Sequence, residues 1–248
     1  MTGQTCLPER AVVFDGYPDS ARRYLDCDAI ICISTLLQTT ILVTAANVGR
    51  RLLLAADRQE AERLARGLSN PLVMRTPGPD TAARAGVAAV TNLVGLGRFE
   101  PHRPLLLVCA ETARLLRNAG DCPYIYLVCL RNLTATAEWV AQRHRRVAVL
   151  APCEHGQLRV EDRLVPARFL GSLSKHAFAP VNMRARELVR SWSGADLSLL
   201  KMSRTVEQLR REGLDEDVDF VLKHVDDLDD VVMYDKHELW LSRETSAA

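Results

Sequence analysis

Long apolar runs are absent from this sequence. No segment approaches the ~20 consecutive apolar residues that a membrane-spanning helix requires, and the N-terminus, MTGQTCLPERAVVF, lacks the basic and then apolar layout of a secretory signal. We therefore expect a cytoplasmic protein that does not enter a membrane. With 48% apolar residues in a chain of 248, there is enough material for a full hydrophobic core.

An excess of charge of one sign is also absent. The 32 basic residues nearly balance the 31 acidic residues, and no block of lysine or arginine is long enough to form the basic surface of a nucleic-acid binder. We expect no nucleic-acid partner.

Several short motifs that identify disulfide, nucleotide, zinc or hydrolase sites are missing as well. The seven cysteines are odd in number and show no CxxC spacing, so they are expected to be reduced residues, mostly in the core. Glycine-rich phosphate loops, HExxH and GxSxG do not occur, which excludes ordinary nucleotide kinases, zincins and serine hydrolases.

What the sequence does contain is an alternation of short apolar runs and helical patterns. Several of the runs are apolar on both faces, which is typical of strands covered by helices on both sides. The alternation predicts an α/β fold with a mixed or mostly parallel sheet flanked by helices. The expected strands are Ala11–Phe14, Ala29–Ile33, Arg51–Ala55, Leu72–Met74, Leu105–Ala110, Ile125–Leu130 and Val147–Leu150, and the expected helices are Ile41–Val48, Asp57–Leu68, Glu111–Asn118 and Leu133–Arg143.

After about residue 155 the pattern predicts a helical C-terminal part. No repeat or linker divides the chain, so we expect a single unit over residues 1–248, with two closely packed lobes, about 1–155 and 156–248, as the alternative. The expected helices are Arg163–Ser174, Arg184–Trp192 and Asp196–Gly213, and the strand-like segments are Asp217–Val225 and Val231–Leu241, on either side of the acidic turn Asp226–Asp230. α/β enzymes of this size commonly form symmetric dimers, so a homodimer is one expected assembly.

Polar residues follow several of the expected strands. Ser34–Thr40 (STLLQTT) stands between a strand and a helix, where a helix N-terminus can hold an anion or where Thr39 and Thr40 simply cap the helix. Arg131 and Asn132 follow another strand, and Asn132 either caps the next helix or binds a substrate. Thr76–Asp80 (TPGPD) is either a functional loop or a plain turn.

A thiol, an imidazole and two carboxylates follow the strand that ends at Leu150. Cys153 and His155 offer a thiol next to a base, while Glu161 and Asp162 offer oxygen ligands for Mg²⁺. The alternative is an ordinary pair of solvated acidic side chains. The acidic runs further on are read as solvated turns.

The order of these segments resembles the 2-phosphosulfolactate phosphatase family, magnesium-dependent phosphatases named for coenzyme M biosynthesis. The likeness runs from about residue 10 to about residue 235. Asp28–Ala45 (DAIICISTLLQTTILVTA) is similar to the family's strand, DVL-x-x-TT turn and TA-containing helix. Cys129–Ala137 (CLRNLTATA) is similar to its S-L-R-N-A-x-A-V-A segment, and Val160–Asp162 (VED) to its LED segment. The elements near the end recur as Ser203, Leu209, Gly213 and Asp217–Phe220.

Two positions depart from the family pattern. The aspartate of the first turn falls on Ser34, and the asparagine and glycine of a later turn have become Ala110 and Glu111. The first change removes a negative charge, whereas Glu111 supplies a carboxylate from a different strand end. The site is therefore expected to be altered from the family's own.

The resemblance implies a magnesium-dependent phosphatase acting on a small phosphorylated hydroxy acid, with Mg²⁺ bound by Glu161 and Asp162. With the residues above, the catalytic candidates are Ser34, Asn132, Cys153, Glu161 and Asp162, and the substrate-binding candidates are Thr39, Thr40, Arg131 and Glu111. Arg131 either neutralises substrate charge or pairs structurally.

Two alternatives stay open. One is a catalytically silent or repurposed relative that binds a small anion or a protein partner in a biosynthetic pathway. The other is altered chemistry with Cys153 as a nucleophile assisted by His155. Both, like the phosphatase hypothesis, require the turns at 34–40, 110–112, 131–132 and 153–162 to meet at one edge of the sheet.

Overall fold

A computed structural model of the protein describes residues 8–34, 36–75, 89–90, 93–153, 158–235 and 238–242. Its strands are β1 (Ala11–Asp15), β2 (Ala29–Cys32), β3 (Leu52–Ala55), β4 (Leu72–Arg75), β5 (Ala89–Val90), β6 (Leu105–Val108), β7 (Ile125–Leu127), β8 (Arg146–Leu150), β9 (Ala179–Pro180), β10 (Val231–Asp235) and β11 (Glu238–Ser242). Its α-helices are α1 (Gln38–Asn47), α2 (Arg58–Ala65), α3 (Leu93–Leu96), α4 (Ala110–Asn118), α5 (Leu133–Arg143), α6 (Val160–Lys175), α7 (Met183–Trp192), α8 (Arg204–Arg211) and α9 (Asp215–Lys223). Short 3₁₀ helices are η1 (Pro18–Tyr24), η2 (Leu130–Asn132) and η4 (Leu197–Met202).

The strands form one mixed sheet in the order β5-β4-β6-β3-β11-β10-β7-β2-β8-β1-β9. Two groups of adjacent strands are parallel within themselves. One group, at one end of the sheet, is β7, β2, β8, β1 and β9, and the other, at the opposite end, is β5, β4, β6 and β3. β2, β3 and β6 are buried along their whole length, as expected for parallel strands covered on both faces. The expected α/β fold is confirmed.

An antiparallel pair of strands, β10 and β11, joins the two parallel halves of the sheet. β10 and β11 pair with each other along five residues. On the outer sides of this pair, β10 is hydrogen-bonded to β7 and β11 to β3, both antiparallel. The sequence predicts one strand-like segment here, Val231–Leu241, but the structure divides it into two strands. The last described strands of the chain therefore lie in the middle of the sheet.

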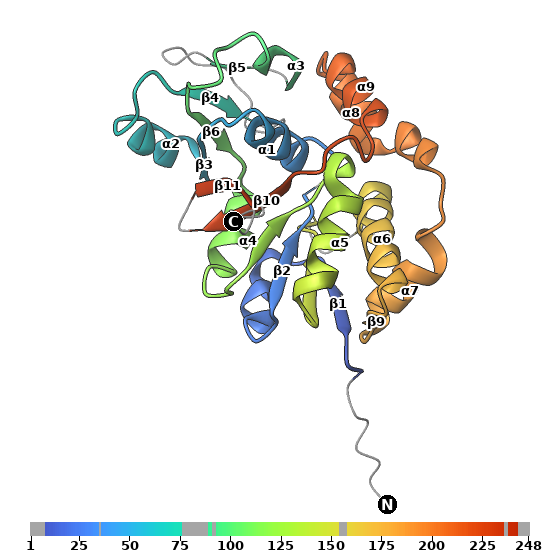
Figure 1. The fold of residues 1–248 in the computed structure, drawn as a ribbon. Coiled ribbons are helices and arrows are strands. Elements are labelled where there is room, and N and C mark those ends of the chain that lie inside the picture. The colour runs from blue at the N-terminus through green and yellow to red at the C-terminus, as the bar shows by residue number, and fades with distance from the viewer. Residues whose placement is uncertain are drawn as a thin grey trace, which may run out of the picture.

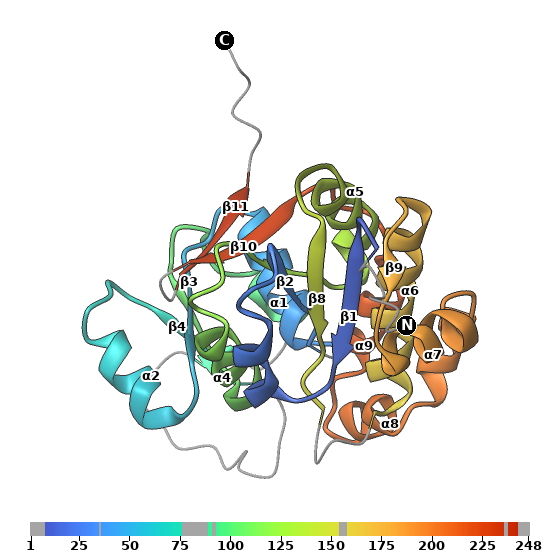
Figure 2. The ribbon, with the colours of Figure 1, turned by 90° about the horizontal axis from the view of Figure 1, so that it is seen from below.

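Helices cover both faces of the sheet. α5, α6 and α7 lie side by side (Figure 1), and seen from below, α5 and η1 lie on opposite sides of β2, β8 and β1 (Figure 2). η1 packs against α4. The core between these layers is almost wholly aliphatic, with Phe14, Phe169 and Tyr126 as its largest buried side chains.

The helical C-terminal part is confirmed, with two changes in detail. Asp217–Val225, expected as a strand, is helical from Asp217 to Lys223, where α9 ends, and Asp217, Val218 and Val221 are buried at helical spacing. Asp196–Gly213, expected as one helix, is η4 followed by α8. The break falls at Ser203, whose extended backbone and hydroxyl cap α8 through Val206 N.

α8 and α9 lie near the edge of the sheet where β1 ends (Figure 2). Among the described residues, no helix combines the length and the apolarity needed to cross a membrane. The six described cysteines are free thiols, and all but Cys27 are buried.

Candidate functional site

The carboxyl ends of β1, β8, β2 and β7 are neighbours, because these parallel strands are adjacent in the sheet. Ligands of open α/β sheets bind at this kind of edge. A pocket lies here, which we call the Glu161 pocket, built from the β2–α1 turn, the end of β7 and the helices α6 and α9. Its lining is Ile33, Ser34, Leu36, Thr39, Thr40, Cys129, Leu130, Glu161, Asp162, Val165, Pro166 and Val221.

The Glu161 pocket is small in this conformation. About 10 Å³ is left for the centre of a water molecule, which is room for about one water or one ion. Leu36, on the β2–α1 turn, has a φ of 45°, a conformation that a leucine rarely adopts and that stores strain. The turn that forms one wall is therefore held by its surroundings rather than by its own preference.

Glu161 is the most unusual side chain of the pocket. It lies in the first turn of α6 and is only 1% exposed. Neither carboxylate oxygen has a hydrogen-bond partner in the part of the chain that the structure describes. An ionised carboxylate buried without a partner is costly, and the positive end of the α6 dipole offsets only part of that cost.

Asp162 is the second carboxylate of the pocket and is also buried. Its Oδ2 accepts a hydrogen bond from Arg159 N at 3.0 Å, so it caps the first turn of α6. The pair thus stands where a helix N-terminus favours negative charge, and the reading as solvated acidic side chains is wrong for both residues.

Ser34, at the end of β2, belongs to a hydrogen-bonded triangle with Gln38 and Thr112. The Ser34 hydroxyl donates to Gln38 Oε1 at 2.7 Å and accepts from Thr112 Oγ1 at 2.8 Å, and Thr112 also contacts Gln38 Oε1. The triangle joins the β2–α1 turn to the start of α4 and carries no charge. The turns at 34–40 and 110–112 therefore meet, as the sequence analysis requires.

Thr39 and Thr40 lie in the first turn of α1 and do not cap it. Thr39 donates its hydroxyl hydrogen to Ser34 O at 2.7 Å, and Thr40 donates to Leu36 O at 2.5 Å. Each threonine thus fixes the strained turn before the helix. In this conformation neither has a hydroxyl hydrogen to offer to an anion, and their substrate-binding role stays a prediction.

Arg131 and Asn132 face the acidic turn at 226–230 instead of the pocket. Arg131 donates to both carboxylate oxygens of Asp227, at 2.9 and 2.8 Å, and to Thr44. The hydrogen bonds of Asp227 with Arg131 and with His224 lower its pKa to about 2. Asn132 accepts from Cys129 N and donates to the carbonyls of Leu127 and Asp230.

The side chain of Asn132 therefore binds backbone on all sides, and Arg131 is paired structurally. Asn132 is fully buried and makes no side-chain cap to α5. The cap comes from Asp226, which accepts from Thr134 N at 2.8 Å. The catalytic role of Asn132 and the substrate-binding role of Arg131 stay predictions.

Cys153 follows β8 and packs against the end of β1. Its Sγ contacts Gly16 O at 2.9 Å. Burial raises the pKa of the Cys153 thiol, and the charge of Asp162 raises it further. A raised pKa keeps the thiol protonated near neutral pH, which is unlike an activated nucleophile. Its expected partner His155 lies outside the described residues, as does Thr76–Asp80.

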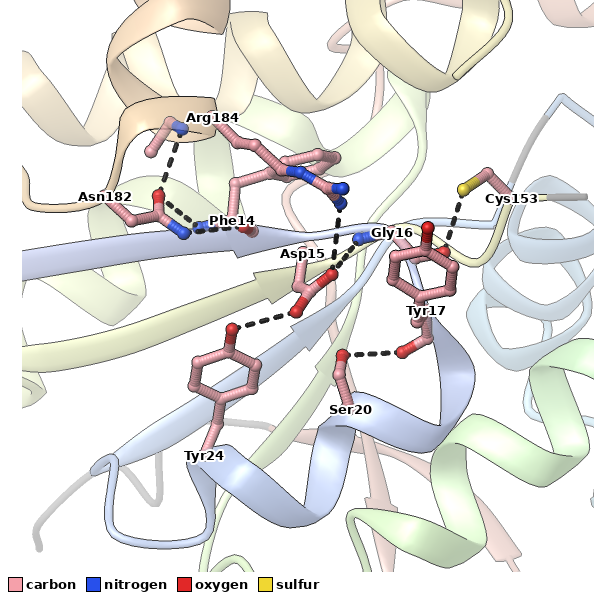
Figure 3. Close-up of polar contacts among 10 residues, drawn as sticks. Phe14, Asp15, Gly16, Tyr17, Ser20, Tyr24, Cys153, Asn182 and Arg184 are labelled. Atoms are coloured by element: carbon pink, nitrogen blue, oxygen red, sulfur yellow. Dashed lines mark hydrogen bonds and ion pairs between the residues drawn. The ribbon is translucent and has the colours of Figure 1, made fainter. Parts of the chain in front are cut away.

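A second polar cluster, which the sequence analysis did not find, surrounds Asp15 at the end of β1 (Figure 3). Asp15 is buried and accepts hydrogen bonds from Gly16 N at 2.7 Å and from Tyr24 Oη at 2.9 Å. Arg184, in the first turn of α7, reaches it with Nη1 at 3.4 Å. Burial and the bond to Asp15 raise the pKa of Tyr24 to about 12. A carboxylate directly after an apolar strand was the signal that could have indicated this cluster.

Glu111 is exposed on α4 and pairs with Arg114 at 3.1 Å. The neighbouring Thr112 faces inward and is fully buried. The start of α4 therefore supplies a hydroxyl to the Ser34 triangle, and the predicted role of Glu111 stays untested. Across the described residues, no group of three or more histidine, cysteine, aspartate or glutamate side chains is gathered to hold a metal.

Comparison with known proteins identifies the family of the chain. The family model of 2-phosphosulpholactate phosphatase matches residues 101–237, which is more than half of the chain, and the protein belongs to this family. It is 26% identical over 126 residues to a probable 2-phosphosulfolactate phosphatase of Symbiobacterium thermophilum. That alignment covers 48% of this chain and 52% of the relative, so the chain spans about half the length of the relative that it matches. Asn132, Cys153, Glu161 and Asp162 lie inside the family match, and Ser34 lies outside it.

Proposed function

We propose that the Glu161 pocket hydrolyses the phosphate ester of a small hydroxy acid of the 2-phosphosulfolactate type, with Mg²⁺ as cofactor. One observation carries this proposal. The Glu161 carboxylate is buried at the functional edge of the sheet, and neither of its oxygens has a hydrogen-bond partner among the described residues. Such an arrangement is stabilised when a cation binds.

The donor set fits Mg²⁺. This ion prefers oxygen ligands, and it is usually bound by one or two carboxylates while waters and substrate phosphates complete its coordination. Glu161 and Asp162 provide two carboxylates in one helical turn, and they would hold the ion. When bound, Mg²⁺ supplies charge neutralisation for the phosphoryl oxygens.

The other residues of the pocket position and enclose the substrate. The triangle of Ser34, Gln38 and Thr112 fixes the β2–α1 turn against α4, which keeps the wall opposite α6 in place. Leu130, Val165 and Val221 make much of the remaining lining apolar, and apolar surroundings strengthen the electrostatic interactions of the carboxylates.

The test measures phosphate release from a panel of phosphorylated hydroxy acids, with Mg²⁺ and with a chelator. We expect turnover only with Mg²⁺, and a loss of about 100-fold or more in kcat/KM for Glu161→Gln. Glu138→Gln, which changes an exposed glutamate of α5, is the matched control and should leave kcat/KM unchanged. A protein that hydrolyses no member of the panel and binds no Mg²⁺ would refute the proposal.

A repurposed binding protein is the second candidate. It is favoured by the neutral Ser34 triangle and by the space for only about one water or ion. Ser34→Asp separates the two candidates: metal-dependent hydrolysis gained by this variant, and absent from the unaltered protein, would indicate a lapsed enzyme. If the unaltered protein is already an active phosphatase, the repurposed function is excluded.

A further inference from the structure

In the part that the structure describes, the Glu161 pocket lacks positive charge to balance the negative charges of the proposed substrate. Its described lining contains two carboxylates and no basic side chain. A substrate of the type proposed above carries a carboxylate and a sulfonate in addition to its phosphate. One divalent cation balances the two carboxylates of the pocket and little more, so a basic group outside the lining is needed for the substrate's other anionic groups.

α7 begins at the same edge of the sheet as the Glu161 pocket. β9 runs parallel to β1, so the helix that follows β9 starts where β1 ends. Asn182 fixes this start: its amide accepts from Phe14 N at 3.3 Å and donates to Phe14 O at 2.9 Å, and it caps α7 through Ala185 N at 3.0 Å. The start of α7 is thereby hydrogen-bonded to the carboxyl end of strand β1 (Figure 3).

Arg184 projects from this turn and is only weakly bound. Its guanidinium lies over the ring of Tyr17, 5.4 Å from the centroid, and its side chain is 42% exposed. Nη1 makes one long contact to Asp15 at 3.4 Å. In the part of the chain that the structure describes, Nε and Nη2 have no hydrogen-bond acceptor, so most of the donors of the guanidinium remain available.

Asp15, in contrast, does not depend on Arg184. Gly16 N and Tyr24 Oη donate to its two oxygens at 2.7 and 2.9 Å. If Arg184 turned toward a ligand, Asp15 would keep two hydrogen bonds and would not become an unsatisfied buried charge. The pair can therefore separate at low cost.

The end of β1, which carries the Asp15 cluster, lies against the segment that leads into the Glu161 pocket. Cys153 Sγ contacts Gly16 O at 2.9 Å, and a Cβ built on Gly16 would lie 3.3 Å from Leu158 Cδ2. Leu158 comes two residues before α6, whose first turn carries Glu161 and Asp162. Arg184, which reaches Asp15 at this end of β1, is therefore near the start of the helix that holds the two carboxylates.

We propose that Arg184 binds an anionic group of the substrate that is not transferred, a carboxylate or a sulfonate, and so determines specificity for phosphate esters of acidic alcohols. Asp15 holds the guanidinium near this position when no substrate is present, and the ring of Tyr17 supports it from below. This inference rests on the proposed function and extends it from the phosphate to the rest of the substrate.

The experiment compares two substrates in the presence of Mg²⁺. One is 2-phosphosulfolactate, and the other is ethyl phosphate, which has no second anionic group. For Arg184→Gln we expect KM for 2-phosphosulfolactate to rise about 10- to 100-fold, as for the loss of a hydrogen bond to a charged group, with kcat/KM for ethyl phosphate unchanged. Arg184→Lys should recover part of the loss, because it keeps the charge but not the planar donors. Arg190→Gln, at the exposed far end of α7, is the matched control.

Equal losses for both substrates, or no loss for either, would overturn the role of Arg184 while leaving the phosphatase proposal intact. If the unaltered protein hydrolyses neither substrate, the phosphatase proposal fails, and Arg184 is then judged by calorimetric binding of sulfolactate. Binding that weakens at least about 10-fold in Arg184→Gln supports the subsite. Binding that is equal in the two proteins, or absent from both, refutes it.

Discussion

Replacing Glu161 with glutamine should make the metal-free protein more stable. The substitution keeps the shape of the side chain but removes a charge that is buried without a partner. Burial of an unpaired ion costs several kcal/mol, the N-terminus of α6 offsets up to about 2 kcal/mol, and the glutamine amide itself leaves about 1–3 kcal/mol of unsatisfied polar burial. We estimate a net gain of about 2 kcal/mol in the free energy of unfolding, or about 4–8 °C in Tm for a chain of this size.

The assay is urea and thermal unfolding of both proteins, first with a chelator and then with Mg²⁺. The unaltered protein should gain about 2.7 kcal/mol when Mg²⁺ reaches 100 times its Kd, whereas Glu161→Gln should gain almost nothing, so the difference between the two proteins should vanish or reverse. Glu138→Gln should behave like the unaltered protein. A Glu161→Gln variant that is less stable than the unaltered protein in chelator would show that the carboxylate has a stabilising partner and would refute the reasoning.

Three further predictions concern the neighbourhood of the pocket. Gly16→Ala should lower the free energy of unfolding by about 1–3 kcal/mol, because an added Cβ would lie 2.7 Å from Cys153 Sγ; the double variant with Cys153→Ala should recover most of this loss in urea unfolding, and a neutral single variant would contradict the packing. Because Arg131, together with His224, holds the pKa of Asp227 at about 2, below its unfolded value, the Arg131–Asp227 pair stabilises the fold fully above about pH 4 and loses its contribution as pH falls toward 2; Arg131→Met should cost about 1 kcal/mol at pH 7 and flatten this part of the pH profile of unfolding. Cys153, whose pKa is raised by burial, should react with iodoacetamide at pH 7 more slowly than a free cysteine, and fast labelling of the native protein would revive the nucleophile hypothesis.

The buried strands were predictable because a strand covered on both faces leaves a continuous apolar run. β2 and β6 fall within the expected Ala29–Ile33 and Leu105–Ala110. The convergence of Ser34 with Glu161 was also predictable, because the carboxyl ends of parallel strands share one edge. Apolar patterns of this kind predict the type of each element and the order of the elements along the chain, and the structure confirms both for these strands.

Features that depend on helical phase or on distant partners were not predictable. α4 begins at Ala110, which turns Glu111 outward and Thr112 inward, and residue type alone does not fix that phase. In α9, the short alternation around Asp217 resembles a strand, but Asp217 is a buried helical residue. Its carboxylate accepts hydrogen bonds from Leu93 N and Val94 N at the start of α3, a distant segment that compensates its burial. Asp15 gains its partners from η1 and α7, which no local pattern connects to β1.

The β10–β11 hairpin has a consequence for how the protein is made. Until residues 231–242 leave the ribosome, β7 and β3 each present an unpaired edge to other chains, and unpaired edges invite aggregation. Before the hairpin is synthesised, the two parallel groups of strands can form only as separate sheets, and pairing of β10 and β11 then joins them into one. Nascent chains stalled just short of the hairpin should thus be the form of this protein that most needs a chaperone.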